Sequence, residues 1–310
     1  MKKILSTLIV LTMLLSMLVA CNNTKTPAEK DYTLSIGVVV TEKTESLKVT
    51  ETVAAIVTDA DGKIVLCRLD CVDYTAKYNE DGTLDTTAPI SKVAAGSTYG
   101  TMPAGSWDEQ GAALEKFVVG KTQAEVAATA LDGTTAADAD LKASCSINIV
   151  DLLKAIDNAF KSEYKTTFKS SSADTFTAGL NIIGTAKDSS VELMAQTEKN
   201  AKFIATFSAA VMAEGKVVAA ILDTAEVEFK GITEAGAASF AFSGTKRELG
   251  ENYGMMPAGT WYTQVDAYAA AAIGKTADDI ATLASEGVAG CTIYAGEYKQ
   301  GIEAAVKAAR

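Results

Sequence analysis

The chain has 310 residues and no histidine, and its 39 acidic and 28 basic side chains give a net charge of −11. This charge repels nucleic-acid phosphates, and the lack of histidine excludes Ser-His-Asp and Cys-His catalysis as well as the mixed Cys/His zinc site. A 48% share of hydrophobic residues predicts a folded body, and the length suits two domains.

The N-terminus indicates a secretory signal peptide over residues 1–20. After Lys2 and Lys3, the apolar run from Ile4 to Ala20 is shorter than the roughly 20 residues needed to cross a bilayer. Leu-Val-Ala-Cys, ending at Cys21, resembles a bacterial lipobox, which implies cleavage before Cys21 and acylation of its thiol by a diacylglycerol carrying fatty acids such as palmitate. We therefore expect a lipoprotein held in the cell membrane by Cys21 and facing the extracytoplasmic side, with residues 21–31 as a tether. An uncleaved anchor is the alternative.

A twelve-residue block occurs twice and defines an internal repeat. It reads YGTMPAGSWDEQ from Tyr99 and YGMMPAGTWYTQ from Tyr253, and it contains both tryptophans, Trp107 and Trp261. Shorter matches extend the repeat in both directions. We predict two units, 32–161 and 175–310, each with its own core, joined by a Ser-, Thr- and Lys-rich linker at 162–174. Further matched pairs are Leu69-Asp70 with Leu222-Asp223, Ser91-Lys92 with Thr245-Lys246, and Gly120-Lys121-Thr122 with Gly274-Lys275-Thr276.

Within each unit the pattern predicts strands followed by helices. Residues 53–74 contain two apolar runs around a turn at 59–62, and residues 203–229 repeat this hairpin around 213–215. Ser106 and Thr260 suit the N-caps of a first helix, which Gly120 and Gly274 would end. Capping boxes then start a second helix at Thr122 and at Thr276, and a last helix covers 150–160 or 297–309. This order predicts an α+β fold, with a sheet packed against helices in two tandem copies.

The segment before each last helix carries a possible cofactor site. It reads ASCSIN from Ala143 and AGCTIY from Ala289. Both segments resemble the flavin attachment motif, Ser-Gly-Ala-(Thr/Ser)-x-Thr, of the FMN-binding domain family. That family occurs in sodium-pumping quinone reductases and in surface flavoprotein lipoproteins of Gram-positive bacteria. The repeated Tyr-Gly…Trp-x-x-Gln block and Gly-Lys-Thr are similar to segments of those lipoproteins.

The resemblance implies an FMN-binding-domain-like fold and electron transfer from a membrane donor. In the family the final threonine of the motif carries FMN through a phosphoester, but this chain has Asn148 and Tyr294 there. We therefore expect at most non-covalent binding of FMN or a similar small ligand. The cofactor-binding candidates, carried over from the motif and from the aromatic block, are Ser144, Cys145, Ser146 and Trp107 in the first unit and Gly290, Cys291, Thr292 and Trp261 in the second.

Each candidate residue also has a structural interpretation. Ser146 and Thr292 either add hydroxyl donors to an anion site before a helix or cap local turns. Trp107 and Trp261 either stack on a ligand ring or fill the edge of a core. The cysteines at 67 and 71 are interpreted as small core residues, with a cluster of four thiolates as the alternative, and those at 145 and 291 as small residues or as redox groups. Two functions follow: an electron-transfer or ligand-binding protein rather than a substrate-converting enzyme, or a non-redox scaffold or partner-binding lipoprotein with degenerate flavin sites.

Overall fold

The computed structural model describes residues 28–81, 83–188, 191–193, 196–198, 200–232, 236–256 and 259–310. The expected signal peptide, the acylated Cys21 and most of the expected tether lie outside these residues. Two four-stranded antiparallel sheets dominate the described part of the chain.

The first sheet has the strand order β3-β2-β1-β8 and the second has the order β14-β13-β12-β9. Their three long strands match one another in order along the chain, whereas β8 and β14 extend the two sheets at opposite edges. The strands of the first sheet are β1 (Lys30–Lys43), β2 (Lys48–Thr58), β3 (Ile64–Thr75) and β8 (Lys165–Ser170). Those of the second are β9 (Phe176–Asp188), β12 (Ala201–Ala213), β13 (Lys216–Ile232) and β14 (Ala238–Ala241).

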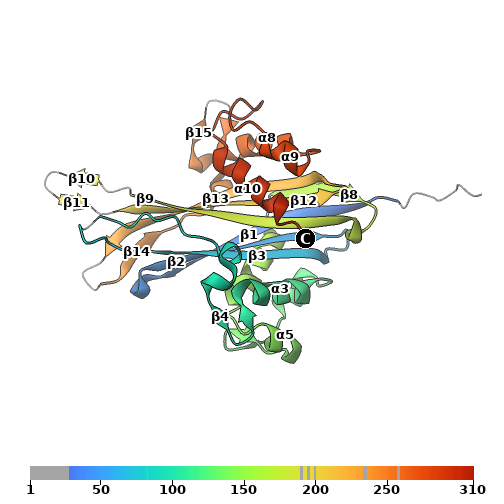
Figure 1. The fold of residues 1–310 in the computed structure, drawn as a ribbon, viewed down its shortest axis with the longest axis horizontal. Coiled ribbons are helices and arrows are strands. Elements are labelled where there is room, and N and C mark those ends of the chain that lie inside the picture. Colours follow the sequence, from blue (N-terminus) through green and yellow to red (C-terminus); the bar gives the residue numbers. More distant parts are fainter. Residues whose placement is uncertain are drawn as a thin grey trace, which may run out of the picture.

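The two sheets stack face to face in the middle of the molecule, and helices cover both outer faces (Figure 1). Strand β3 lies against β9, and its counterpart β13 lies against β1, as a twofold relation between the halves requires. One apolar core fills the space between the sheets and takes residues from both, including the stacked rings of Tyr74 and Phe203 at 5.0 Å. The layers are therefore helices, sheet, sheet and helices.

The helices of the two halves occupy opposite sides of this double sheet. Below the first sheet in Figure 1 lie α3 and α5, and above the second lie α8, α9 and α10. A separate core joins each helical layer to its own sheet. The first helical layer comprises α2 (Lys92–Ala95), α3 (Trp107–Val118), α4 (Gln123–Ala127), α5 (Ala139–Ser144) and α6 (Val150–Lys161). The second comprises α7 (Lys246–Leu249), α8 (Trp261–Ala272), α9 (Ala277–Ala281) and α10 (Gly296–Lys307).

Short elements complete the chain. Four two-stranded ribbons are described: β4 (Thr101–Met102) with β5 (Gly105–Ser106), β6 (Leu131–Asp132) with β7 (Thr135–Ala136), β10 (Val191–Leu193) with β11 (Gln196–Glu198), and β15 (Met255–Met256) with β16 (Gly259–Thr260). The 3-10 turns are η1 (Thr44–Ser46), η2 (Gly96–Tyr99), η3 (Ala173–Thr175) and η4 (Gly250–Tyr253).

The last helix of each half lies so close to its sheet that only glycine fits beneath it. A Cβ on Gly37 of β1 would overlap the backbone of Ala155 and Ala159 in α6. A Cβ on Gly179 of β9 would likewise overlap the backbone of α10 at Ala305. These contacts fix the distance between α6 or α10 and the strands under it.

The α+β class, both hairpins, the helix caps and the last helices are confirmed. Thr122 and Thr276 form the expected capping boxes, and Gly120 and Gly274 follow the ends of α3 and α8 with φ of +82° and +78°.

Two expectations need correction. The linker expected at 162–174 contains β8, whose residues 165–170 pair with β1 at the edge of the first sheet. The expectation of one core per half is also incomplete, because each half has its own core between sheet and helices while the inner faces of the two sheets share a third.

Candidate functional site

A buried glutamine joins the two repeated sequence segments in each half. In the first half, Gln110 of α3 accepts hydrogen bonds from the backbone N–H of Ser146 at 2.7 Å and from its hydroxyl at 3.0 Å. The Gln110 amide group donates to the carbonyl oxygen of Gly105 at 2.8 Å. The aromatic block and the cysteine-containing motif are thus brought together, about 36 residues apart in sequence.

The second half repeats this arrangement atom for atom. Gln264 of α8 accepts from the N–H of Thr292 at 2.9 Å and from its hydroxyl at 2.8 Å, and it donates to Gly259 at 3.2 Å. Both glutamines are fully buried. Because a buried amide needs its partners, each glutamine acts as a fixed bridge between the turn and the helix.

The expected anion site at the start of the last helix is not formed. Ser144 is the last residue of α5, and α6 begins only at Val150, so Ser146 does not stand at a helix start. In the second half Gly290 has φ of +80°, and α10 begins at Gly296, four residues after Thr292. The N–H and hydroxyl groups expected to face an anion are instead bonded to the glutamines.

The two tryptophans are core residues, as the structural interpretation holds. Trp107 is 5% exposed and Trp261 is 3% exposed, and each belongs to the core beneath its helical layer. Trp261 meets the rings of Tyr253 and Tyr298 edge to face, with centroids 6.2 Å and 5.9 Å apart. Protein atoms cover almost all of each indole, although Trp107 also lines a small cleft.

The motif cysteines are buried thiols. Cys145 is fully buried and Cys291 is 4% exposed, and burial raises the pKa of both above the ordinary value. Cys67 and Cys71 lie on the same face of β3, and burial raises the pKa of Cys71 to about 12. All four are free thiols. Because the thiolate is the reactive form, these cysteines are chemically quiet.

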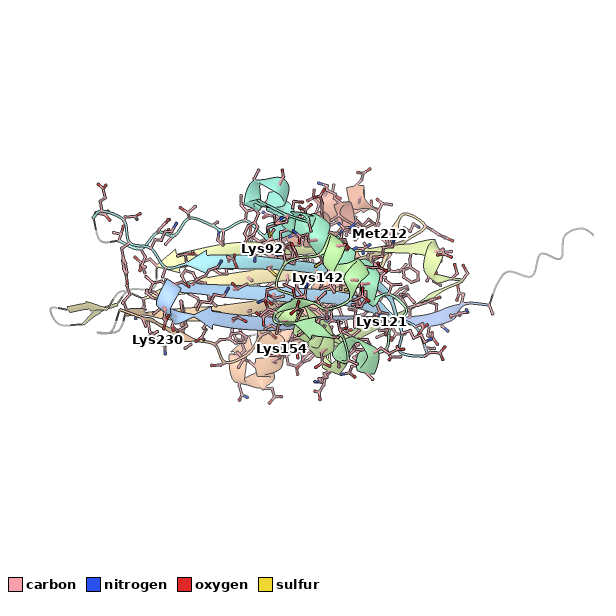
Figure 2. All side chains as sticks on the ribbon, turned by 90° about the horizontal axis from the view of Figure 1, so that it is seen from below. Lys92, Lys121, Lys142, Lys154, Met212 and Lys230 are labelled. Carbon is pink, nitrogen blue, oxygen red and sulfur yellow. The ribbon has the colours of Figure 1, made fainter. Side chains whose placement is uncertain are left out.

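Each tryptophan lies beside a cluster that the motif analysis missed. The cluster consists of two lysines, an acidic residue and a tyrosine. In the first half, the Lys92 ammonium is 4.9 Å from the ring centre of Tyr99 and 5.4 Å from that of Trp107. The Asp73 carboxylate pairs with Lys48 at 2.6 Å and with Lys92 at 3.5 Å. Burial alone would raise the pKa of Asp73, but these lysines outweigh it and lower the pKa. Figure 2 looks onto this helical layer and labels Lys92.

The second half carries the same cluster with a longer acid. Lys246 is 4.6 Å from the ring centre of Tyr253 and 5.4 Å from that of Trp261, and it pairs with Glu226 at 2.8 Å. Glu226 also pairs with Lys202 at 3.1 Å. The sequence signal was present, since every member recurs at an offset of 153 or 154, but the residues lie too far apart along the chain to suggest a cluster.

A buried aspartate also recurs and holds the start of a short helix. Asp70 accepts hydrogen bonds from the N–H of Cys71 at 2.8 Å and of Val93 at 3.0 Å. Asp223 accepts in the same way from Thr224 at 2.7 Å and Arg247 at 3.2 Å. Burial raises the pKa of each aspartate from 3.8 to about 6, although these hydrogen bonds act in the opposite direction.

Mild acid is therefore expected to stabilise the protein. With a pKa of about 6 when folded and 3.8 when unfolded, each aspartate binds more protons in the folded state. Its contribution to stability is present at low pH and is lost as pH rises through 6. Lowering the pH from 7.5 to 5 should raise the free energy of unfolding by about 1–2 kcal/mol per aspartate, measured by urea denaturation. Asp70→Asn should remove one aspartate's share of this pH dependence, because Asp223 and the buried Glu51, whose pKa burial also raises, keep theirs. An unchanged dependence in the variant would refute the assignment.

A small cleft lies beside Trp107 in the first half. It measures about 80 Å³ and is lined by side chains that include Lys92, Trp107 and Asn148. Ligand sites for drug-sized molecules have volumes of roughly 300–1,000 Å³. A flavin ring does not fit this cleft as the side chains stand. Asn148 and Tyr294, at the position of the family's threonine, are both exposed.

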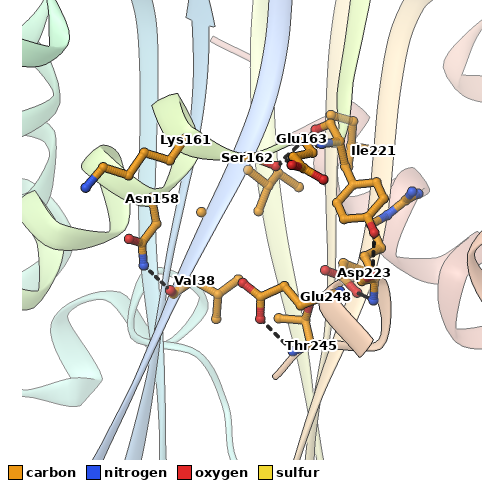
Figure 3. Close-up of a pocket in the computed structure, with 13 residues that line it drawn as sticks. Val38, Asn158, Lys161, Ser162, Glu163, Ile221, Asp223, Thr245 and Glu248 are labelled. Carbon is orange, nitrogen blue, oxygen red and sulfur yellow. Dashed lines mark hydrogen bonds between the residues drawn. The ribbon is translucent and has the colours of Figure 1, made fainter. Parts of the chain in front are cut away.

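A wider cleft lies between residues of the two halves. It measures about 350 Å³ and lies between the end of α6 on one side and β13 with α7 on the other (Figure 3). Asn158 donates to the carbonyl oxygen of Val38 at 2.7 Å on one wall, and Asp223 and Glu248 line the other. Tyr164 crosses between the halves, because its hydroxyl donates to the carbonyl oxygen of Arg247 at 2.6 Å.

Within the described residues, no helix is both long and apolar enough to cross a membrane. The same residues contain no group of three or more Cys, Asp or Glu side chains placed to hold a metal ion.

Comparisons with known proteins assign no family to the chain. No protein-family model matches it. The searches of curated proteins and of solved structures also found no match. The resemblance to FMN-binding domains therefore rests on the sequence motifs quoted above.

Proposed function

We propose that this chain is an extracytoplasmic lipoprotein, anchored through Cys21, that binds a ligand or partner and does not carry electrons. The observation that carries this proposal is the pair of glutamine bridges. Gln110 and Gln264 occupy the space between the two segments that the resemblance assigns to flavin, and they use the donors of Ser146 and Thr292. Ser146 and Thr292, which the resemblance assigns to a flavin site, thus hold the turn against the helix.

Three further observations support this proposal. Both tryptophans are buried in cores, so they are not free to stack on a cofactor. The motif thiols have raised pKa values because they are buried. The cleft of about 350 Å³ between the halves has room for a drug-sized ligand, and it contains none of the residues of the flavin motif.

Non-covalent FMN binding, with electron relay from a membrane donor, is the second candidate. One observation favours it: Trp107 and Asn148, which come from the two repeated segments, line the same cleft. FMN could enter only if the side chains around this cleft moved apart. The FMN-binding-domain-like fold belongs to both candidates.

Flavin titration distinguishes the two candidates. We expect the purified protein to be colourless, and we expect no saturable change in tryptophan fluorescence when FMN is added to high micromolar concentration. The titration should be repeated with Trp107→Phe, which keeps an aromatic ring at this position. Flavin absorbance that survives dialysis, or saturable FMN binding that Trp107→Phe weakens, would establish the second candidate instead.

A further inference from the structure

The first half has a small cleft where the second half has a tyrosine side chain. Leu152 lines the cleft, and Tyr298 stands at the matching position, since each lies seven residues after its motif cysteine. Tyr298 is buried, its hydroxyl lies 3.1 Å from that of Thr224, and its ring meets Trp261 edge to face. In the first half Cys71 replaces Thr224, and leucine replaces the phenol. A space lined by polar groups is left open.

Hydrogen-bond donors dominate the lining of this cleft. Thr52 accepts from the thiol of Cys71 at 3.3 Å, so its own hydroxyl hydrogen is free to donate. The oxygen of Asn148 accepts from the N–H of Val150 at 3.0 Å, and its NH₂ group adds a donor. Lys43 and Lys92 also line the cleft, and each carries an ammonium group. The single carboxylate in the lining, Asp151, already accepts from the Thr41 hydroxyl at 2.9 Å.

The charges around the cleft also favour an anion. Lys43, Lys48 and Lys92 stand against the carboxylates of Asp73 and Asp151. Lys92 lies 3.5 Å from Asp73, whereas its counterpart Lys246 lies 2.8 Å from the longer Glu226. The first lysine is therefore held less tightly by its own acid. This positive site is notable on a chain with a net charge of −11.

We propose that the cleft beside Trp107 is a binding site for a small carboxylate such as acetate or formate. The volume of about 80 Å³ is well below the roughly 300–1,000 Å³ of sites for drug-sized molecules, which suits a ligand of only a few heavy atoms. Asn148 and the exposed Lys43 form its mouth, and Thr52, Lys92 and Trp107 lie deeper. FMN bound in this cleft, as in the second candidate function, would exclude the carboxylate.

Acetate titration at constant ionic strength tests the site in the full chain, purified as the cell processes it. Tryptophan fluorescence should change saturably, with a Kd of about 0.1–10 mM, because so small a ligand makes few contacts. Acetamide has the same shape without the charge and should give no saturable change. Absence of saturation with acetate, as expected for a cleft that holds water only, or an equal response to acetamide, would overturn the proposal.

Two matched variants locate the binding. Lys43 and Lys187 are both exposed lysines at the same register position, opposite Lys48 and Lys202 in their sheets. Lys43→Met should weaken acetate binding about tenfold, the usual effect of losing one charge-assisted hydrogen bond, while Lys187→Met should leave the Kd unchanged. Equal weakening by both would indicate a general charge effect and refute the site.

Filling the cleft provides an independent check. Leu152→Tyr copies the side chain of the second half and should abolish the acetate response. Unchanged binding in a folded Leu152→Tyr variant would place acetate elsewhere and refute the proposal. If this variant does not fold, the exposed Lys43→Met and Lys187→Met pair and the acetamide control still decide the question.

Discussion

Replacing Gln264 by leucine is expected to lower the free energy of unfolding by about 3–5 kcal/mol. The substitution removes three hydrogen bonds, and it leaves the N–H of Thr292 and the carbonyl oxygen of Gly259 without their partner. Each buried polar group left unpaired costs about 1–3 kcal/mol. Gln110→Leu should have a similar effect because Gln110 makes the matching three bonds in the first half. Urea denaturation measures both losses.

Gln123→Leu is the matched control. Gln123 makes one side-chain hydrogen bond, to Asp157 at 2.8 Å, and is only partly buried. Its loss should cost less than about 1 kcal/mol, because water can replace the partner. If Gln264→Leu cost as little as the control, the bridge would not be the element that holds the motif in place, and the space between the segments would be open to another group.

The second large effect is expected when Gly37 or Gly179 is replaced by alanine. The added Cβ would overlap backbone atoms of α6 or α10, and a helix backbone cannot rotate away as a side chain can. The helix must shift off the sheet, and we expect a loss of about 3 kcal/mol in either variant. Thermal or urea unfolding gives this value directly.

Gly111→Ala tests whether glycine removal alone causes the loss. Gly111 lies within α3, and its added Cβ would meet the ring of Trp107 at 3.5 Å, an ordinary contact. Since alanine favours a helix by up to about 1 kcal/mol over glycine, this variant should be neutral or stabilised. Gly37→Ala with the stability of the parent would show that α6 is free to move from the first sheet.

Local patterns made part of this fold predictable. The turn at 213–215, with Glu214 and Gly215 at φ of 50° and 75°, needs only neighbouring residues, and so do the capping boxes at Thr122 and Thr276. The stacking of the sheets is not local. The residues at 165–170 resemble a polar linker because β8 is an edge strand whose lysines reach solvent, and only its pairing with β1 reveals it as a strand.

The sequence also made only part of the candidate site predictable. The repeated block and the cysteine motif do meet, as a single ligand site built from both would require. Their meeting through Gln110 and Gln264 was not foreseen, because glutamine in a helix pattern is typical of an exposed position. The roles of Lys92 and Asp73 were also missed, since the residues of each cluster come from two strands, a short helix and a 3-10 turn that only the tertiary fold brings together.

The placing of β3 on β9, and of β13 on β1, bears on how such a chain could arise. A lone half would expose the inner face of its sheet to water, and the same face of a second copy would cover it in a symmetric homodimer. Joining two copies makes that association intramolecular, with an effective concentration of about millimolar or more for a short connection. Once joined, the halves are free to diverge. One can keep a cavity at Leu152 that the other has closed with Tyr298, a difference that two copies of one gene product cannot have.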